Sequence, residues 1–319
     1  MLYIKEKDES ITATKEYEMT EEILNIQSTE KQKDNIALAI GFFDGLHLGH
    51  RLLIEEVKKA DGCIPCVLTF TKDFKANLKH EKQELLLTKE EEREMLSSLG
   101  IKKEFILPFN EETKNTGKEE FLDFLKRLNP RLIVVGKDFT FARMASGKAA
   151  DLLSLKQEGI DVKILSLLLE GKEKISSTLI KSLLKEGKIQ ESDKLLGYDY
   201  YLKGVVTHGY ENGRKIHFPT ANMAYPEYKV RLKEGVYETT TEIDGKNYRS
   251  MTNIGNHPTI DVLGKDIVET HVINHDEDLY GKEIKVSFKR YLRPQRKFAS
   301  LDELSKQLQA DRASILRHS

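Results

Sequence analysis

Two histidines stand three residues apart at the end of the stretch 39–50, which reads Ala-Ile-Gly-Phe-Phe-Asp-Gly-Leu-His-Leu-Gly-His. The apolar run at 36–40 predicts a buried parallel strand, and the apolar spacing within 51–59 predicts a helix. One helical turn would bring His47 and His50 to the same side of the helix start. Backbone N–H groups at such a start favour an anion. This strand, turn and helix therefore suit a triphosphate that must lose charge in a reaction.

Glycines shape residues 41–50, hereafter the signature turn. Gly41 and Gly45 let the backbone turn tightly, and Gly49 removes a side chain where the helix begins. The histidines could instead be half of a zinc site, for which no further His/Cys pair lies at a suitable spacing, or part of an ordinary solvated helix start. A strand, Gly-x-Phe-Asp-Gly, His-x-Gly-His and a helix in this order resemble the signature of the nucleotidyltransferase superfamily, which implies that both histidines hold ATP phosphates.

Composition narrows the class of protein. The chain has 319 residues, enough for about two domains at ~150 residues each. Its net charge of −1 gives no overall attraction to nucleic acid or to an anionic membrane. The first eight residues lack a signal-peptide core and no apolar run could span a bilayer, so we expect a cytoplasmic protein. Cys63 and Cys66 precede a strand instead of opening a helix, which favours a structural role over a redox one.

The first half of the chain alternates between predicted strands and helices. Strands are expected at 36–41, 65–70, 103–108, 132–136 and 161–165. Helices are expected at 87–96, with Thr88 as N-cap and Glu91 completing a capping box, and at 117–128 and 147–158. A short strand near 2–4 and a helix around 21–26 are expected upstream. This alternation predicts a doubly wound parallel sheet.

A second helix start follows this sheet. Residues 174–184 place Ser176, Ser177 and Thr178 at a predicted helix N-terminus. Their hydroxyls could cap the helix or bind phosphate, and the presence of another anion-seeking helix start in the chain makes the two roles about equally favoured.

The pattern changes after Gly187. Short strands at 201–208, 235–243, 246–254, 267–273 and 283–290, separated by glycine-containing turns, predict an antiparallel barrel or sandwich. An amphipathic helix at 300–311 closes the chain. We therefore expect two domains, residues 1–186 and 187–319.

The second half carries motifs in a recognisable order. They are Gly-Val-Val-Thr-His-Gly at 204–209, Gly-Arg-Lys at 213–215, Phe-Pro-Thr-Ala-Asn at 218–222, Val-Glu-Thr-His at 268–271 and Leu-Arg-Pro at 292–294. This order resembles the riboflavin kinase barrel. From about residue 36 onward, the chain resembles the prokaryotic bifunctional riboflavin kinase/FMN adenylyltransferase (FAD synthetase) family. The resemblance implies an α/β doubly wound nucleotidyltransferase (Rossmann-like) domain, followed by an antiparallel β-barrel flavokinase domain with a C-terminal helix.

The resemblance implies two reactions with Mg²⁺ and ATP. In the first, riboflavin is phosphorylated to FMN, with Thr220 and Asn222 as Mg²⁺ ligands and Glu269 as the base for the ribityl hydroxyl. Without the resemblance, Glu269 would pass for an ordinary outward-facing strand residue. In the second, the FMN phosphate attacks the α-phosphate of ATP, giving FAD and pyrophosphate, while the side chains of His47 and His50 stabilise the charge.

The resemblance also implies further contacts with ATP or flavin. They fall on Gly41, Phe42, Asp44, Gly45, Gly49, Asp138, Phe139, Ser176, Ser177, Thr178, Lys181, Gly204, Gly209, Arg214, Phe218, Pro219 and Arg293. The implied partners are small molecules (riboflavin, FMN and ATP), with no nucleic acid and no membrane.

The chain departs from the family pattern in three places. Lys181 replaces an arginine and so lacks the bidentate fork, and His217 replaces a glycine. The segment after Phe70 lacks a proline-rich acidic stretch. Two alternatives to the two-step enzyme follow: an enzyme that retains one step, or a non-catalytic flavin- or nucleotide-binding regulator on the same fold.

Overall fold

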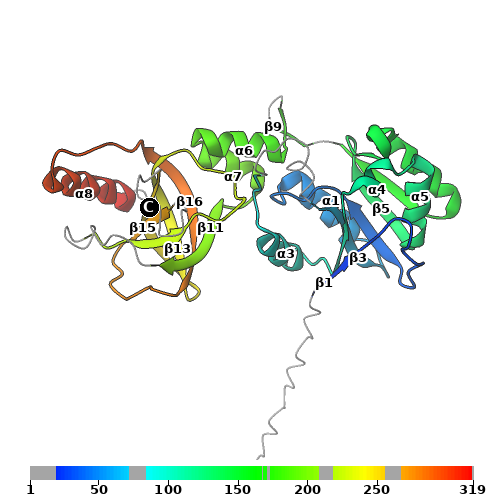
Figure 1. Ribbon diagram of the computed structural model, residues 1–319, viewed down its shortest axis with the longest axis horizontal. Coiled ribbons are helices and arrows are strands. Elements are labelled where there is room, and N and C mark those ends of the chain that lie inside the picture. The colour runs from blue at the N-terminus through cyan, green and yellow to red at the C-terminus, as the bar shows by residue number, and fades with distance from the viewer. Residues whose placement is uncertain are drawn as a thin grey trace, which may run out of the picture.

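The computed structural model describes residues 19–71, 84–166, 168–170, 173–207, 218–255 and 267–317. Figure 1 shows an α/β part and a β-barrel, with two helices, α6 and α7, lying between them. Among the residues described, no helix is long and apolar enough to cross a membrane.

The α/β part is built on a six-stranded parallel sheet of order β1-β4-β3-β2-β5-β8. Its strands are β1 (Thr20–Ile23), β2 (Ile36–Ile40), β3 (Ile64–Phe70), β4 (Lys103–Leu107), β5 (Pro130–Gly136) and β8 (Asp161–Leu165). Every residue of β2 is buried, as expected for a central strand covered on both faces. The strand order reverses between β2 and β5, and ligands of such sheets bind beyond the carboxyl ends of the strands at this reversal. The signature turn leaves β2 at this point.

Helices cover both faces of the sheet (Figure 1). The α-helices are α1 (Leu48–Lys58), α3 (Lys89–Ser98), α4 (Glu111–Asn115) and α5 (Lys118–Arg127), with 3₁₀ helices η1 (Arg143–Ala145) and η2 (Ala149–Glu158). Short strand pairs are β6 (Thr140–Phe141) with β7 (Gly147–Lys148), and β9 (Leu169–Glu170) with β10 (Glu173–Lys174). The capping box predicted for α3 is confirmed, since Thr88 and Glu91 each bond to the other's backbone N–H. Cys66 is buried in β3, where desolvation raises its pKa to about 12, so the structure gives it a packing role.

One expectation for this part is wrong, and a second is confirmed only in part. The helix expected around 21–26 is instead strand β1, because its backbone pairs with the free edge of β4: the N–H of Thr20 bonds to Lys102 O and that of Leu24 to Ile106 O. Within the helix expected at 147–158, the first two residues form strand β7, which pairs with β6. The remaining residues are helical, but they form the 3₁₀ helix η2. The strand expected near 2–4 lies outside the described residues.

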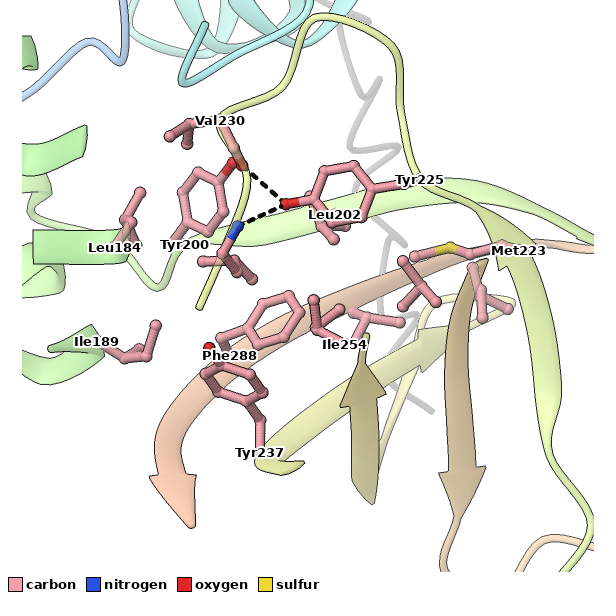
Figure 2. Packing of buried hydrophobic residues seen from close by; sticks show 14 of the residues in the cluster. Leu184, Ile189, Tyr200, Leu202, Met223, Tyr225, Val230, Tyr237, Ile254 and Phe288 are labelled. Atoms are coloured by element: carbon pink, nitrogen blue, oxygen red, sulfur yellow. Dashed lines mark hydrogen bonds between the residues drawn. The ribbon is translucent and has the colours of Figure 1, made fainter. Parts of the chain in front are cut away.

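Helices α6 (Ser177–Glu186) and α7 (Ile189–Leu196) connect the two parts. The sequence did not predict α7. Both helices pack their apolar residues into the main cluster of the barrel, in which Leu184 and Ile189 lie near Tyr200 and Phe288 (Figure 2). The boundary at 186/187 stays a prediction, and one apolar cluster extends across it.

The barrel is closed, which settles the choice between barrel and sandwich. Its strands run in the order β11-β12-β15-β14-β13-β16. They are β11 (Tyr201–Thr207), β12 (Ala221–Ala224), β13 (Gly235–Ile243), β14 (Lys246–Ile254), β15 (Ile267–Val272) and β16 (Glu283–Arg293). The short strand β12 was not predicted. Helix α8 (Leu301–Arg317) extends beyond the expected end at 311 and packs outside the barrel, with Ile315 against Met251.

The interior of the barrel contains hydroxyl groups as well as apolar side chains. Thr239 bonds to Ser250 and to Thr252 at 2.8 Å, and Thr252 bonds to Thr270 at 3.0 Å. Thr241 also bonds to Ser250, at 2.7 Å. All five residues are buried, so these hydrogen bonds satisfy polar groups that would otherwise be costly inside the barrel.

Candidate functional site

The signature turn places its two histidines together at the start of α1. His47 is the N-cap, and its Nδ1 accepts the backbone N–H of His50 at 3.4 Å. The two rings stack with centroids 3.7 Å apart. His47 is buried, and desolvation lowers its pKa to about 4 against a smaller, opposing effect of Asp44. The ring is therefore neutral near pH 7, and because Nδ1 is the acceptor, its proton is on Nε2.

The glycines of the turn fit a crowded site. Gly45 has φ +83°, and a Cβ atom there would lie 2.5 Å from Cδ1 of Leu86. A Cβ at Gly49 would lie 3.1 Å from Cε1 of His47. A side chain at position 45 would displace Leu86, and one at position 49 would displace His47.

The second helix start meets the first. Ser176 caps α6 by accepting the N–H of Leu179, and Ser177 Oγ donates to the backbone O of Asp44 at 2.8 Å. Lys181 Nζ lies 2.5 Å from the Asp44 carboxylate. The structure thus brings the two helix N-termini singled out in the sequence to one place, with the exposed side chain of Thr178 on α6.

The other predicted residues of this half lie around the turn or beyond β5. Phe42 is 50% exposed and stacks on Phe70 with centroids 5.0 Å apart, whereas Phe139 is half-buried and stacks on Phe141. Asp138 forms an ion pair with Lys174.

Sequence reasoning missed Lys174 as a site residue. Its charge lowers the pKa of His47 while that of Asp138 raises it, so the pair lies within electrostatic reach of the histidine. Its position just before the three hydroxyl residues of α6 was the available signal. The described residues contain no group of three or more His, Cys, Asp or Glu side chains that could hold a metal, so the zinc alternative gains no further ligands there.

A second polar group forms on the barrel, across four neighbouring strands. Thr207 of β11 is opposite Asn222 of β12, Asn222 is opposite Glu269 of β15, and Glu269 is opposite Asn253 of β14. These four residues, hereafter the polar row, lie on the outer face, since Val268 and Thr270 on either side of Glu269 are buried inside. The structure therefore brings the predicted residues Asn222 and Glu269 together.

Hydrogen bonds fix the side chains of the polar row. Asn253 Nδ2 donates to Glu269 Oε2 at 3.4 Å, and Gln295 Nε2 donates to Asn253 Oδ1 at 2.8 Å. Asn222 Nδ2 donates to the backbone O of Thr220 at 3.3 Å, so its side-chain oxygen is the atom that can face a cation. Sequence reasoning did not assign Asn253 to the site, because only the pairing of β14 with β15 brings it to Glu269.

The remaining predicted residues of the barrel take varied positions. Pro219 accepts a bond at its backbone O from the buried His271 ring, at 2.8 Å, and Phe218 packs on the same ring. Gly204 lies within β11, beside Met223 of β12. Gly209, Arg214 and His217 lie outside the described residues. Arg293 forms a two-nitrogen ion pair with the buried Asp311 at 2.8–2.9 Å, which fastens α8 to the barrel.

A cavity of about 460 Å³ lies elsewhere, between α3 and the barrel. Its lining includes Glu94 of α3 and Lys203 and Lys282 of the barrel. Both lysines form ion pairs with acidic residues of the same lining, Lys203 with Glu94 and Lys282 with Asp244. The cavity contains neither the histidines nor the polar row.

Comparison with known proteins covers both halves. The family model described as FAD synthetase matches residues 29–179, and the one described as riboflavin kinase matches residues 196–318. A bifunctional riboflavin kinase/FMN adenylyltransferase of Listeria monocytogenes is 31% identical, over 87% of this chain and 90% of its own length. One from Escherichia coli K12 is 30% identical, over 89% and 92%.

A solved structure extends the likeness to three dimensions. A Streptococcus pneumoniae chain described as a macrolide-efflux protein is 29% identical and has a TM-score of 0.82, covering 94% of this chain and 100% of that one. The order of elements, the two polar sites and the identity over nine-tenths of the curated relatives agree. This chain belongs to the bifunctional riboflavin kinase/FMN adenylyltransferase family.

Proposed function

We propose that this protein makes FAD from riboflavin in two ATP-dependent steps, one on each half of the chain. The observation that carries the proposal is the match of two separate family models, each over a part that has its own polar site. Riboflavin, FMN and ATP are the substrates. We place the reaction in the cytoplasm, because both steps consume ATP.

The adenylyl transfer belongs to the signature turn. An oxygen of the FMN phosphate attacks the α-phosphorus of ATP, the bond to the β-phosphate breaks, and pyrophosphate leaves. Nε2–H of His47, the ring of His50 and the N–H groups that begin α1 would donate to the phosphate oxygens as charge moves onto pyrophosphate. The neutral His47 ring still has this one N–H to donate, because its Nδ1 is the acceptor for the His50 N–H. The Ser177 hydroxyl and the Lys181 ammonium reach the same turn from α6.

The phosphorylation belongs to the polar row. The terminal ribityl hydroxyl of riboflavin attacks the γ-phosphorus of ATP, and ADP leaves. Glu269 would accept the hydroxyl proton, with Asn253 holding one carboxylate oxygen in place. Because Glu269 is half-buried and lies between two asparagines, it differs from an ordinary solvated strand glutamate.

We also propose that Mg²⁺ takes part, with Thr220 and Asn222 as its protein ligands. Hydroxyl and amide oxygens suit this hard cation, which typically takes few protein ligands and completes its shell with phosphate and water. When bound, the ion would neutralise charge on the ATP phosphates. The bond between Asn222 and the Thr220 backbone fixes the side chain from which one of these oxygens comes.

One chromatographic assay tests both steps. Purified protein is incubated with ATP and Mg²⁺ and with either riboflavin or FMN, and the flavins are separated. We expect FMN and then FAD from riboflavin, and FAD from FMN. A folded protein that forms neither product contradicts the proposal. Formation of one product alone identifies the single-step alternative and shows which half is active.

A further inference from the structure

The carboxylate of Asp44, in the signature turn, is held from outside the sheet. Its Oδ1 accepts the backbone N–H of Leu86 at 2.8 Å, and its Oδ2 pairs with Lys181. The Leu86 side chain also packs closely over Gly45, where it fills the space that a Cβ atom would need. The place of Leu86 therefore sets the place of the turn that carries His47 and His50.

Residue 86 is in turn fixed by the barrel. The barrel loop 225–234 pairs with the neighbouring residue, since Leu85 N–H donates to Tyr228 O at 2.6 Å and Val230 N–H donates to Leu85 O at 2.8 Å. The Tyr225 hydroxyl braces this loop by donating to Val230 O at 2.7 Å and accepting the N–H of Leu232 at 3.1 Å (Figure 2). This loop of the barrel thus forms a two-bond pairing with the chain beside Leu86.

An ion pair closes this arrangement. Lys229, at the centre of the loop, places Nζ 2.7 Å from Glu91 Oε2 of α3, and the two side chains are 0% and 3% exposed. Glu91 Oε2 also accepts the N–H of Thr88 at 2.8 Å. Thr88 is the last residue of the segment that begins at Leu85. The Lys229 ammonium lies 4.9 Å from the ring centroids of both Tyr200 and Tyr201. Removing one partner of such a pair leaves an uncompensated buried charge.

We propose that Lys229, a residue of the kinase barrel, is a positioning residue for adenylyl transfer on the other half of the chain. It holds residues 85–88 between the barrel and α3, so that Leu86 presents its N–H to Asp44 and keeps the signature turn in its productive shape. The inference rests on the proposed function for the reaction that is affected. The contacts themselves do not depend on that function.

The test compares two lysines of the barrel that pair with the same helix. Lys229→Met removes the buried pair. Lys203→Met removes two exposed pairs: Lys203 with Glu94 (3.2 Å), whose side chains are 29% and 62% exposed, and Lys203 with Glu283 (3.3 Å). FAD formation from supplied FMN, FMN formation from riboflavin, and amide hydrogen exchange of the peptide 84–91 are measured for both variants and the parent.

We expect Lys229→Met to lower kcat for FAD formation at least tenfold, with a smaller change in KM for ATP, because the loss falls on transition-state positioning. FMN formation should stay within twofold, and peptide 84–91 should exchange faster. Lys203→Met should stay within twofold of the parent in both reactions. If Lys229→Met does not fold, Glu91→Gln with Lys229→Met leaves no unpaired buried charge, and this double variant should also form FAD at least fivefold more slowly.

Three results would overturn the inference. The first is FAD formation within twofold of the parent in a folded variant that lacks the pair. The second is a parallel loss of both activities, which assigns Lys229 a purely structural role. The third is unchanged hydrogen exchange at 84–91. If the parent itself makes no FAD, the proposed function fails, and the exchange measurement still decides whether Lys229 holds this segment.

Discussion

The two candidate sites are assembled in opposite ways. The signature turn takes its histidines, glycines and aspartate from ten consecutive residues, and the φ of Gly45 and the N-cap at His47 give it its shape. The polar row takes one residue from each of four strands, and its members lie up to 62 positions apart in the chain, from Thr207 to Glu269. One site is local in sequence, whereas the other exists only when the strands pair in the correct register.

Because of this difference, the two sites are sensitive to changes in different parts of the chain. The local turn depends on the segments that hold it from outside, here Leu86, Ser177 and Lys181. A site made by register depends on every strand that contributes to it. Variants in one site should therefore leave the chemistry of the other nearly unchanged, and the following experiments test that separation.

The largest expected effect is at Glu269. Glu269→Gln keeps the shape and the bond to Asn253 but removes the proton acceptor, so riboflavin phosphorylation should fall by ~10²–10⁴-fold. Riboflavin binding, followed by flavin fluorescence, and FAD formation from FMN should persist. The matched control is Glu283→Gln, an exposed strand glutamate, which should change neither rate. Phosphorylation near the parent rate in Glu269→Gln would show that the base is another group.

Two fragments that differ by helix α6 test with which half of the chain this helix is stable. The barrel fragment 173–319 should be more stable to urea than 187–319 by about 5 kcal/mol, because the shorter fragment loses the buried side chains of Ile175, Ile180 and Leu184 from the shared cluster. Both fragments should phosphorylate riboflavin when folded. Equal stability would show that α6 belongs energetically with the α/β part.

The histidines of the signature turn should affect one reaction only. His47→Asn keeps a good N-cap residue, and His50→Ala leaves the cap in place, so neither should unfold α1. Each should lower FAD formation about 10²-fold, as is typical for the loss of one preorganised donor. Phosphorylation of riboflavin should stay unchanged, and His275→Ala, which removes a barrel histidine packed on Tyr248, should leave FAD formation intact. Equal loss of both activities would contradict separate sites.

A smaller effect is expected on stability in acid. Burial lowers the pKa of His47 from 6.5 to about 4, so the unfolded chain binds a proton that the folded chain excludes between these values. The contribution of neutral His47 is complete above pH 6.5 and is lost as the pH falls toward 4, by ~2 kcal/mol at pH 5.

Urea unfolding at pH 7 and pH 5 measures this loss, which His47→Asn should lack. Asp193, whose pKa burial raises to about 7, has an effect of opposite sign, but it is present in both proteins and cancels in the comparison. A variant that loses as much stability as the parent between these pH values would show that His47 is not the group responsible.

The same contrast explains what the sequence could predict. The parallel strands, the capping box of α3 and the signature turn follow from neighbouring residues, and they were predicted from them. Strand β1 was mistaken for a helix because its four residues gain their conformation from the edge of β4, a partner about 80 positions away. Strand β12 was missed because it is short and only its two neighbours define it.

The sites divide in the same way. His47 and His50 could be assigned from spacing, whereas Asn253 could not, because the loop length between β14 and β15 does not fix which residues face each other. The link from Lys229 through Leu86 to Asp44 joins three segments with no pattern in common. Lys181 and Arg293 were expected to contact ATP or flavin. In the structure, Lys181 pairs with Asp44 and Arg293 pairs with Asp311.

The buried hydroxyl groups of the barrel stabilise the strand register on which the polar row depends. A shift of β14 by one residue would turn Met251 and Asn253 inward and expel Ser250 and Thr252, which would orphan Thr239 and Thr270 in an apolar interior. Misaligned barrels are therefore penalised during folding before any substrate is present. These hydroxyl groups lie inside the barrel, away from the polar row, and they favour the correct strand register. The register that satisfies their hydrogen bonds is also the one that places Glu269 between its two asparagines.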